Sequence, residues 1–216
     1  MTEPAPRADD ERRLVTGLVL AGGLGYRMGG VDKGLVPLAG RPMVEHVLDA
    51  LRPQVGTILV NANRNPDRYA AYGYPVFADT LGGYLGPLAG VLSALPHVRT
   101  DFLVTVPCDA PLLAADLVRR LHAACVAAGA DVAVACDGTR LQPVFLLLRK
   151  DLASALESYL AAGGRKVDAW FDRVRIAKVD FGDAPDTFVN INDAEERRRV
   201  EARLLATAGP GSSSIA

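Results

Sequence analysis

The chain has 216 residues, half of which are hydrophobic, and its formal net charge is −1. This length and composition fit one compact α/β domain with a sizeable core. The interspersed charges give no basis for bulk attraction to nucleic acid, and no apolar run is long enough for a membrane span, so we expect neither kind of partner.

The three cysteines are odd in number and lack the spacing of metal ligands, which argues against a disulfide framework and fits a reducing, cytoplasmic location. The three histidines are far apart in the sequence, and we expect ordinary structural roles for them. We expect a disordered lead over residues 1–13, a single domain over 14–207 and a disordered tail over 208–216.

The most informative stretch covers residues 17–40. Its apolar run from Leu18 to Leu20 predicts a buried strand. Closely spaced glycines follow, with the cations Arg27 and Lys33 among them: Gly22, Gly23, Gly25, Gly29, Gly30 and Gly34. Glycine lets backbone N–H groups approach and wrap a polyphosphate, and the two cations supply the opposite charge. The stretch therefore predicts a phosphate-binding loop, with a flexible surface loop as the alternative.

Two familiar phosphate loops do not fit this stretch. A Walker loop needs Gly-Lys followed by Ser or Thr, whereas Lys33 is preceded by Asp32 and followed by Gly34. A Rossmann fingerprint needs a third glycine where Met28 stands, and a helix that opens at once. Proline and glycine keep the chain non-helical until about Arg41. We therefore expect the loop and its side chains, rather than an immediate helix, to hold the phosphate.

Three segments together, Leu20-Ala21-Gly22-Gly23, Arg27-Met28-Gly29-Gly30 and Asp32-Lys33-Gly34-Leu35, resemble the signature of the molybdenum cofactor guanylyltransferases. These are nucleotidyltransferases with a Rossmann-like, glycosyltransferase-A type fold. The resemblance implies a three-layer α/β/α sandwich over residues 14–207, with a mostly parallel sheet and at least one antiparallel strand. It also implies catalytic roles for Arg27 and Lys33, and GTP contacts from Leu20, Ala21, Gly22, Gly23 and Lys33.

Apolar periodicity and turn residues predict the remaining elements. We expect helices over about 42–52, 88–95, 113–129 and 152–160, a final helix after Asp193, and strands over 57–60, 75–77, 102–106, 132–136, 144–148 and 174–181. The connection at Asp137-Gly138 is short, which predicts that the strand over 144–148 runs antiparallel to the strand before it.

Two polar residues follow predicted strands where nucleotide contacts are expected. Asn61 can read a base edge or a ribose, or simply form a turn. Asp79 can accept from guanine N1 and N2, or cap a turn. The resemblance implies that both hold GTP. It also makes the run from Gly86 to Gly90 a second family motif, at a helix N-terminus that can present N–H groups to the ligand.

Asp109 follows the most apolar strand, within Pro107-Cys108-Asp109, where a carboxylate can reach a phosphate-bound Mg²⁺. Its alternative role is a helix cap, but the resemblance implies a catalytic metal ligand that also contacts GTP. For the second substrate we consider Gln142, Arg165, Lys166, Asn190 and Asn192. Trp170 and Phe171 either flank a basic platform for a pterin phosphate or belong to the core, with the cations solvated.

The resemblance implies Mg²⁺-dependent transfer of GMP from GTP to molybdopterin, forming the guanine dinucleotide cofactor and pyrophosphate. Because the attacking phosphate oxygen is already a nucleophile, positioning and charge neutralisation suffice for catalysis. The alternatives are a molybdopterin cytidylyltransferase, a sugar-phosphate nucleotidylyltransferase and a non-catalytic GTP-binding regulator. Proteins that deliver or accept the cofactor in molybdoenzyme assembly are possible partners.

Overall fold

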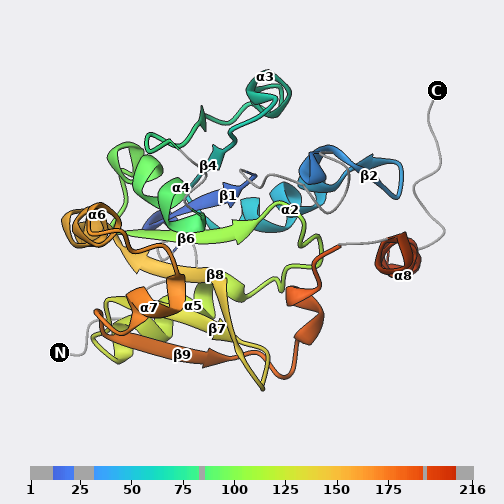
Figure 1. Cartoon of the computed structure of the whole chain (residues 1–216). Coiled ribbons are helices and arrows are strands. Elements are labelled where there is room, and N and C mark those ends of the chain that lie inside the picture. The colour runs from blue at the N-terminus through green and yellow to red at the C-terminus, as the bar shows by residue number, and fades with distance from the viewer. Residues whose placement is uncertain (1–11, 22–31, 83–85, 192–193, 208–216) are drawn as a thin grey trace.

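The computed structural model describes residues 12–21, 32–82, 86–191 and 194–207. The strands of its main sheet are β1 (Val15–Leu20), β4 (Thr57–Asn61), β5 (Val76–Phe77), β6 (Phe102–Pro107), β7 (Val132–Cys136), β8 (Leu141–Arg149) and β9 (Ile176–Asp180). The α-helices are α2 (Met43–Leu51), α3 (Pro66–Ala70), α4 (Pro87–Ala94), α5 (Leu117–Ala127), α6 (Ala153–Ala161), α7 (Val167–Phe171) and α8 (Ala194–Thr207). A hairpin of β2 (Pro37–Leu38) and β3 (Arg41–Pro42) lies apart from the main sheet, near α8 (Figure 1).

The sheet has the strand order β5-β4-β1-β6-β8-β7-β9. Strand β1 pairs in parallel with β4 and β6, and β9 pairs in parallel with β7. Strand β8 runs antiparallel to both β6 and β7. The predicted mostly parallel sheet with an antiparallel strand after Asp137-Gly138 is therefore confirmed.

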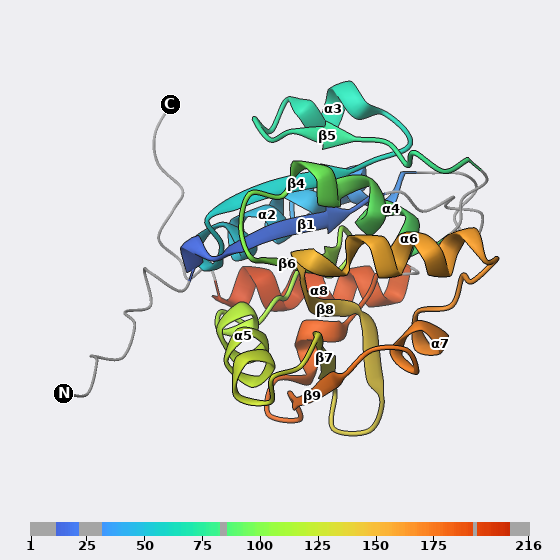
Figure 2. The same cartoon turned by 90° about the vertical axis from the view of Figure 1, so that its left-hand side faces the viewer.

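Helices cover both faces of the sheet and make three layers. Side chains alternate along a strand, so Val15 and Val19 of β1 face one layer and Leu18 faces the other. Helices α2 and α5 pack on the first face, whereas α4, α6 and α7 pack on the second. Figure 2 looks at that second face, with α4 and α6 in front of the sheet and α2 behind it. The α/β/α sandwich expected from the sequence is confirmed.

Several element boundaries differ from the sequence prediction, most of all the starts of α5 and β8. Helix α5 begins at Leu117, so Leu113 is buried but precedes the helix. Strand β8 begins at Leu141, because a register shift between Val134 and Ala135 lets its first residues pair with β7. Helix α2 begins just after the proline of β3. The final helix expected after Asp193 is α8, and Asp193 itself lies outside the described residues.

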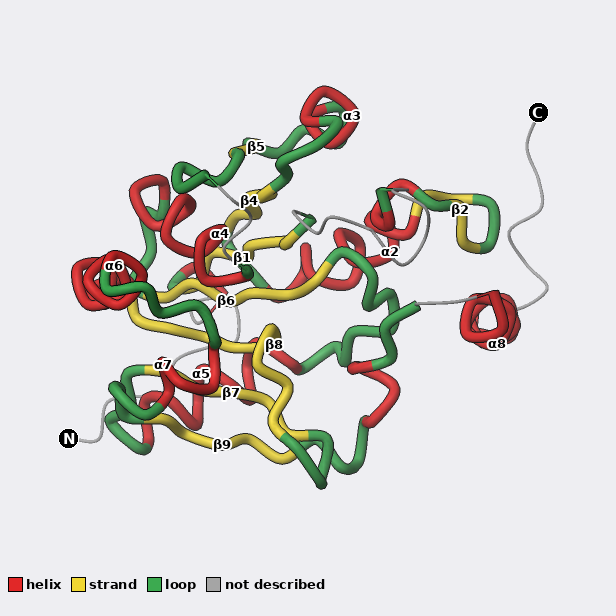
Figure 3. The backbone as a smooth tube through the Cα atoms, in the orientation of Figure 1, coloured by secondary structure: helices red, strands yellow, loops and turns green. Residues whose placement is uncertain are grey.

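The β2–β3 hairpin was not expected from the sequence. Its turn uses two positive φ angles, 48° at Ala39 and 80° at Gly40, which suits the tight turn of a hairpin. The apolar side chains of Leu38 and Met43 pack with Ile191 and with Val200 of α8. Figure 3 shows this corner apart from the main sheet. No helix of the described residues is long and apolar enough to cross a membrane.

Candidate active site

The carboxyl ends of three parallel strands meet at one edge of the sheet. Leu20 at the end of β1 is in register with Asn61 of β4 and with Pro107 of β6. Beyond that row, the Ala21 N–H donates to the Asn61 carbonyl at 2.8 Å, and the Cys108 N–H donates to the Leu20 carbonyl at 3.1 Å. Ligands of open α/β sheets bind outside this edge. The fold thus brings together Leu20, Ala21 and Asn61, which were predicted from separate motifs.

Lys33 and Asp109 form an ion pair at this edge. The Lys33 Nζ lies 3.1 Å from Asp109 Oδ2, and the two side chains are 24% and 15% exposed. Lys33 opens the short 3-10 turn η2 (Lys33–Leu35) that follows the first glycine-rich stretch. Nothing in the sequence pointed to this pairing, because the two residues are far apart in the chain. The ion pair places a cation and a carboxylate side by side where a triphosphate and its metal would need both.

Asp79 is held by two asparagines. The Asn61 Nδ2 donates to Asp79 Oδ1 at 2.9 Å and to the Phe77 carbonyl at 3.2 Å. The Asn63 Nδ2 donates to Asp79 Oδ2 at 2.8 Å, and Asn63 Oδ1 accepts from the Asp79 N–H at 2.7 Å. Each carboxylate oxygen has a further lone pair for a ligand. Sequence reasoning missed Asn63, although its place two residues after Asn61, just beyond the end of β4, could have drawn attention to it.

Gly90 lies inside α4 and is buried against Asn61. A Cβ at this position would lie 2.5 Å from Asn61 Oδ1 and 2.9 Å from Leu20 Cδ2. Glycine therefore lets the helix come close enough to hold the Asn61 side chain against Asp79. Gly86, the first residue of the same motif, has a positive φ of 83°. A Cβ added to it would lie 3.7 Å from the Arg165 carbonyl oxygen.

The loop that carries Asp109 is fixed by the C-terminal part of the chain. The Ile191 N–H donates to the Asp109 carbonyl at 3.2 Å, so the neighbouring Asn190 lies at this edge as well. Farther along the loop, the Ala114 N–H donates to Thr187 Oγ1 at 3.2 Å. These contacts join the two segments over a large sequence separation.

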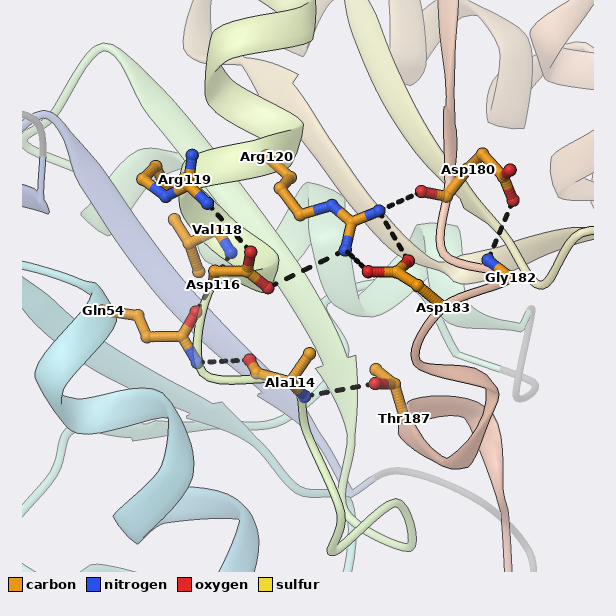
Figure 4. A network of polar contacts seen from close by, with 10 residues as sticks. All are labelled: Gln54, Ala114, Asp116, Val118, Arg119, Arg120, Asp180, Gly182, Asp183 and Thr187. Atoms are coloured by element: carbon orange, nitrogen blue, oxygen red, sulfur yellow. Dashed lines mark hydrogen bonds and ion pairs between the residues drawn. The ribbon is translucent and has the colours of Figure 1, made fainter.

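A polar network holds both segments in place (Figure 4). Gln54 Nε2 donates to the Ala114 carbonyl at 2.9 Å, and its Oε1 accepts from the Val118 N–H at 3.1 Å. Arg120 pairs with Asp183 at 2.9 Å. Its guanidinium also lies 3.9 Å from the centre of the Phe181 ring. The network explains why the helix begins only at Leu117: the side chains of Gln54 and Thr187 take up the backbone carbonyl and N–H of Ala114.

The residues considered for the second substrate are only partly brought together. Gln142 Nε2 donates to Asp137 Oδ2 at 2.7 Å, at the start of β8. Arg165 donates to the Leu160 carbonyl at 2.7 Å, and the side chain of Lys166 is exposed. Trp170 and Phe171 are 1% and 6% exposed within the core. The aromatic platform is therefore wrong, and the core alternative holds for both rings.

Several predicted site residues, Gly22, Gly23, Arg27 and Asn192, lie outside the described residues, so their roles remain predictions. Within the described part, no group of three or more His, Cys, Asp or Glu side chains is placed to hold a metal ion. A single carboxylate such as Asp109 is nevertheless a suitable donor set for Mg²⁺, which binds one or two carboxylates together with substrate phosphates and water.

Cys108 stands directly before Asp109 but is unsuited to nucleophilic attack. Its side chain is buried, and burial together with the charges of Asp109 and Asp32 raises the pKa of its thiol well above the usual range. A thiol needs to ionise to act as a nucleophile. The site therefore offers positioning and charge, without a covalent nucleophile at Cys108.

Comparison with known protein families assigns this architecture. The MobA-like NTP transferase domain matches residues 17–176, which include Lys33, Asn61, Asp79 and Asp109. The chain belongs to this family. The MobA-like NTP transferases are nucleotidyltransferases, and the convergent edge of the sheet lies within the matched residues.

Two relatives named molybdenum cofactor guanylyltransferase come from Shewanella loihica and from Shewanella sp. strain MR-4. Each is 48% identical to this chain over 190 residues, which is 88% of the chain and 97% or 96% of the relative. Molybdopterin-guanine dinucleotide biosynthesis protein A from Archaeoglobus fulgidus shares the fold, with a TM-score of 0.74, 23% identity and coverage of 88% and 99% of the two chains. A 4-diphosphocytidyl-2C-methyl-D-erythritol synthase from Anaerococcus prevotii also shares it, with a TM-score of 0.71, 11% identity and coverage of 93% and 100%.

Proposed function

We propose that this chain is a molybdenum cofactor guanylyltransferase, which transfers GMP from GTP to the terminal phosphate of molybdopterin. The observation that carries the proposal is the convergence of Asn61, Asp79 and the Lys33–Asp109 pair at one edge of a MobA-like NTP transferase domain. The relatives at 48% identity, which are named for this activity, support it. Proteins that deliver or accept the cofactor, and a cytoplasmic location, belong to the same proposal.

In the proposed reaction, a phosphate oxygen of molybdopterin attacks the α-phosphorus of GTP. A new phosphorus–oxygen bond forms, the bond to the β-phosphate oxygen breaks, and pyrophosphate leaves. Lys33 neutralises part of the triphosphate charge, and Arg27 has the same proposed role. Holding the two phosphates in line and stabilising the developing charge account for the rate, with no covalent enzyme intermediate.

Asp109 would hold Mg²⁺, with the nucleotide phosphates and water completing its ligands. When bound, the ion supplies positive charge at the α-phosphate and the leaving group. The carboxylate already lies next to Lys33 at 3.1 Å, and Ile191 holds its backbone. This arrangement supports a fixed donor at the carboxyl end of β6.

Guanine selection is proposed to depend on Asp79. Guanine presents N1–H and N2–H₂ as donors, and a carboxylate held on both oxygens by Asn61 and Asn63 is in position to accept them. Cytosine and adenine lack this pair of donors, so they would leave the half-buried Asp79 carboxylate without its ligand contacts. A site of this kind rejects the wrong ligand by a large factor, on the order of 10²-fold or more.

The decisive experiment measures pyrophosphate release with GTP, CTP or ATP at equal concentrations, with and without molybdopterin. We expect release to depend on molybdopterin and to be much faster with GTP. Asp79→Ala should reduce the ratio of the pyrophosphate-release rates with GTP and CTP. The control Asp172→Ala, at an exposed residue, should leave this ratio unchanged. Comparable release with CTP would refute the guanylyl assignment. GTP binding without any release would favour the regulator instead.

A further inference from the structure

The carboxylate of Asp32, next to Lys33, is buried and held by the α3 segment. Asp32 is 8% exposed, and its two oxygens accept from different residues. The Tyr69 hydroxyl donates to Oδ1 at 2.5 Å, and the Asn65 Nδ2 donates to Oδ2 at 2.9 Å. As the sequence neighbour of Lys33, Asp32 could in principle neutralise its charge. The structure shows that both oxygens of Asp32 serve another element, whereas Lys33 pairs with Asp109.

The two donors to Asp32, Tyr69 and Asn65, are themselves held in place. Tyr69 is fully buried, and burial, with the nearby Cys108 and Asp32, raises the pKa of its hydroxyl far above the usual range, so it stays a proton donor. Asn65 has a left-handed backbone with φ 47°, directly before Pro66 at the start of α3. A non-glycine residue in this conformation is strained and persists where its surroundings hold it. Its bond to Asp32 is such a restraint.

Three segments meet at the Tyr69 hydroxyl. A Cβ on Gly34 would lie 2.5 Å from that oxygen and 3.2 Å from Cys108 Sγ. The η2 turn with Lys33, helix α3 and the loop with Asp109 are therefore in contact at one point. Because Gly34 follows Lys33 and Cys108 precedes Asp109, the Tyr69 hydroxyl is packed beside the sequence neighbour of each member of the ion pair.

We propose that Tyr69 and Asn65 are positioning residues for nucleotide binding, which act by turning the Asp32 carboxylate into α3 and leaving the Lys33 ammonium directed at Asp109 and the triphosphate. The inference deepens the proposed function, on which it rests, and adds two residues that do not touch the nucleotide. Loss of the Tyr69 hydroxyl leaves a buried carboxylate with one donor fewer. That charge then competes for Lys33, the cation beside it.

The test is GTP binding by calorimetry, in the presence of Mg²⁺, to the full chain carrying Tyr69→Phe. We expect the Kd for GTP to rise about tenfold, the scale of coupling within one polar network. The Kd for guanosine, which lacks the triphosphate, should not change. The matched control is Tyr72→Phe, which removes a hydroxyl near Glu45 in the same segment and should leave both values unchanged.

A double-mutant cycle separates positioning from simple destabilisation. In a Lys33→Met background, Tyr69→Phe should change the Kd for GTP by less than about twofold, because the proposed effect passes through Lys33. The positioning role is overturned if Tyr69→Phe raises the Kd for guanosine as much as the Kd for GTP. It is also overturned if the substitution raises the Kd for GTP equally with Lys33 and with Met at position 33. If wild type binds GTP and transfers GMP while Tyr69→Phe matches it, only this inference fails. If wild type does not bind GTP, the proposed function fails with it.

Discussion

Gly90→Ala adds one methyl group at the point where α4 touches Asn61. The added Cβ would lie 2.5 Å from Asn61 Oδ1 and 2.9 Å from Asn61 Cγ, both far closer than a normal contact. Asn61 cannot move away without loss of its hydrogen bonds to Asp79 and to the Phe77 carbonyl. The substitution therefore perturbs the base-binding network through its packing, without removing a polar group.

Two opposing terms set the effect on stability. Forcing a methyl group into a packed site costs about 1–3 kcal/mol. Alanine is better than glycine inside a helix by about 1 kcal/mol. The free energy of unfolding should therefore fall by about 0–2 kcal/mol, and the protein should stay folded. Loss of one hydrogen bond to a charged group costs about 1.5–3 kcal/mol, which corresponds to GTP binding weakened about 10- to 100-fold.

Calorimetric titration of GTP, together with urea unfolding, measures both quantities on the same preparation. Gly82→Ala is the control, because a Cβ at Gly82 would meet nothing within 4 Å. We expect the control to match wild type in both measurements. A Gly90→Ala protein that binds GTP as tightly as wild type would refute the role given to this helix contact.

Three further substitutions separate charge, metal and scaffold. Asp109→Asn should keep the fold but slow Mg²⁺-dependent transfer by about 10²-fold or more, and near-normal turnover would rule out Asp109 as the principal ligand. Lys33→Ala should weaken GTP binding strongly with little change in melting temperature; superimposable titrations and equal turnover would count against it. Gln54→Leu should lower the free energy of unfolding, measured by urea titration, by about 1–3 kcal/mol, because it leaves the buried Val118 N–H without its acceptor and the Ala114 carbonyl with only the Leu117 N–H; an unchanged midpoint would contradict that role.

The parallel strands could be predicted because each carries its own apolar pattern, whereas the three-layer arrangement was implied by the resemblance to the guanylyltransferases. Strands β1, β4 and β6 read as short buried runs, and residues that follow such runs converge at one edge in any open α/β sheet. Asn61 and Asp109 were found on that basis. The glycine-rich loop that first suggested phosphate binding lies mostly outside the described residues, so Arg27 remains a prediction.

What the sequence did not reveal depends on distant contacts. The spacing of Leu113, Leu117 and Leu121 fits one helix face, but Gln54 and Thr187 take up the backbone groups that precede α5. The β2–β3 hairpin has two-residue strands, too short for any periodicity. The hydrogen-bond donors to Asp32 and Asp79 come from other segments of the chain. No local sequence pattern shows which side chains will form these bonds.

The strand order has a consequence for how the protein matures during synthesis. Strands β5, β4, β1 and β6 all come from the first half of the chain, and they can pair before β8, β7 and β9 leave the ribosome. The hydrogen bond from Ile191 to Asp109 must wait until almost the whole chain has been made. Domains of this size fold in stages, and contacts distant in sequence form late. We therefore expect a nascent chain to pair strands β5, β4, β1 and β6 early. The loop that carries Asp109 should reach its final position only when the chain is about to leave the ribosome.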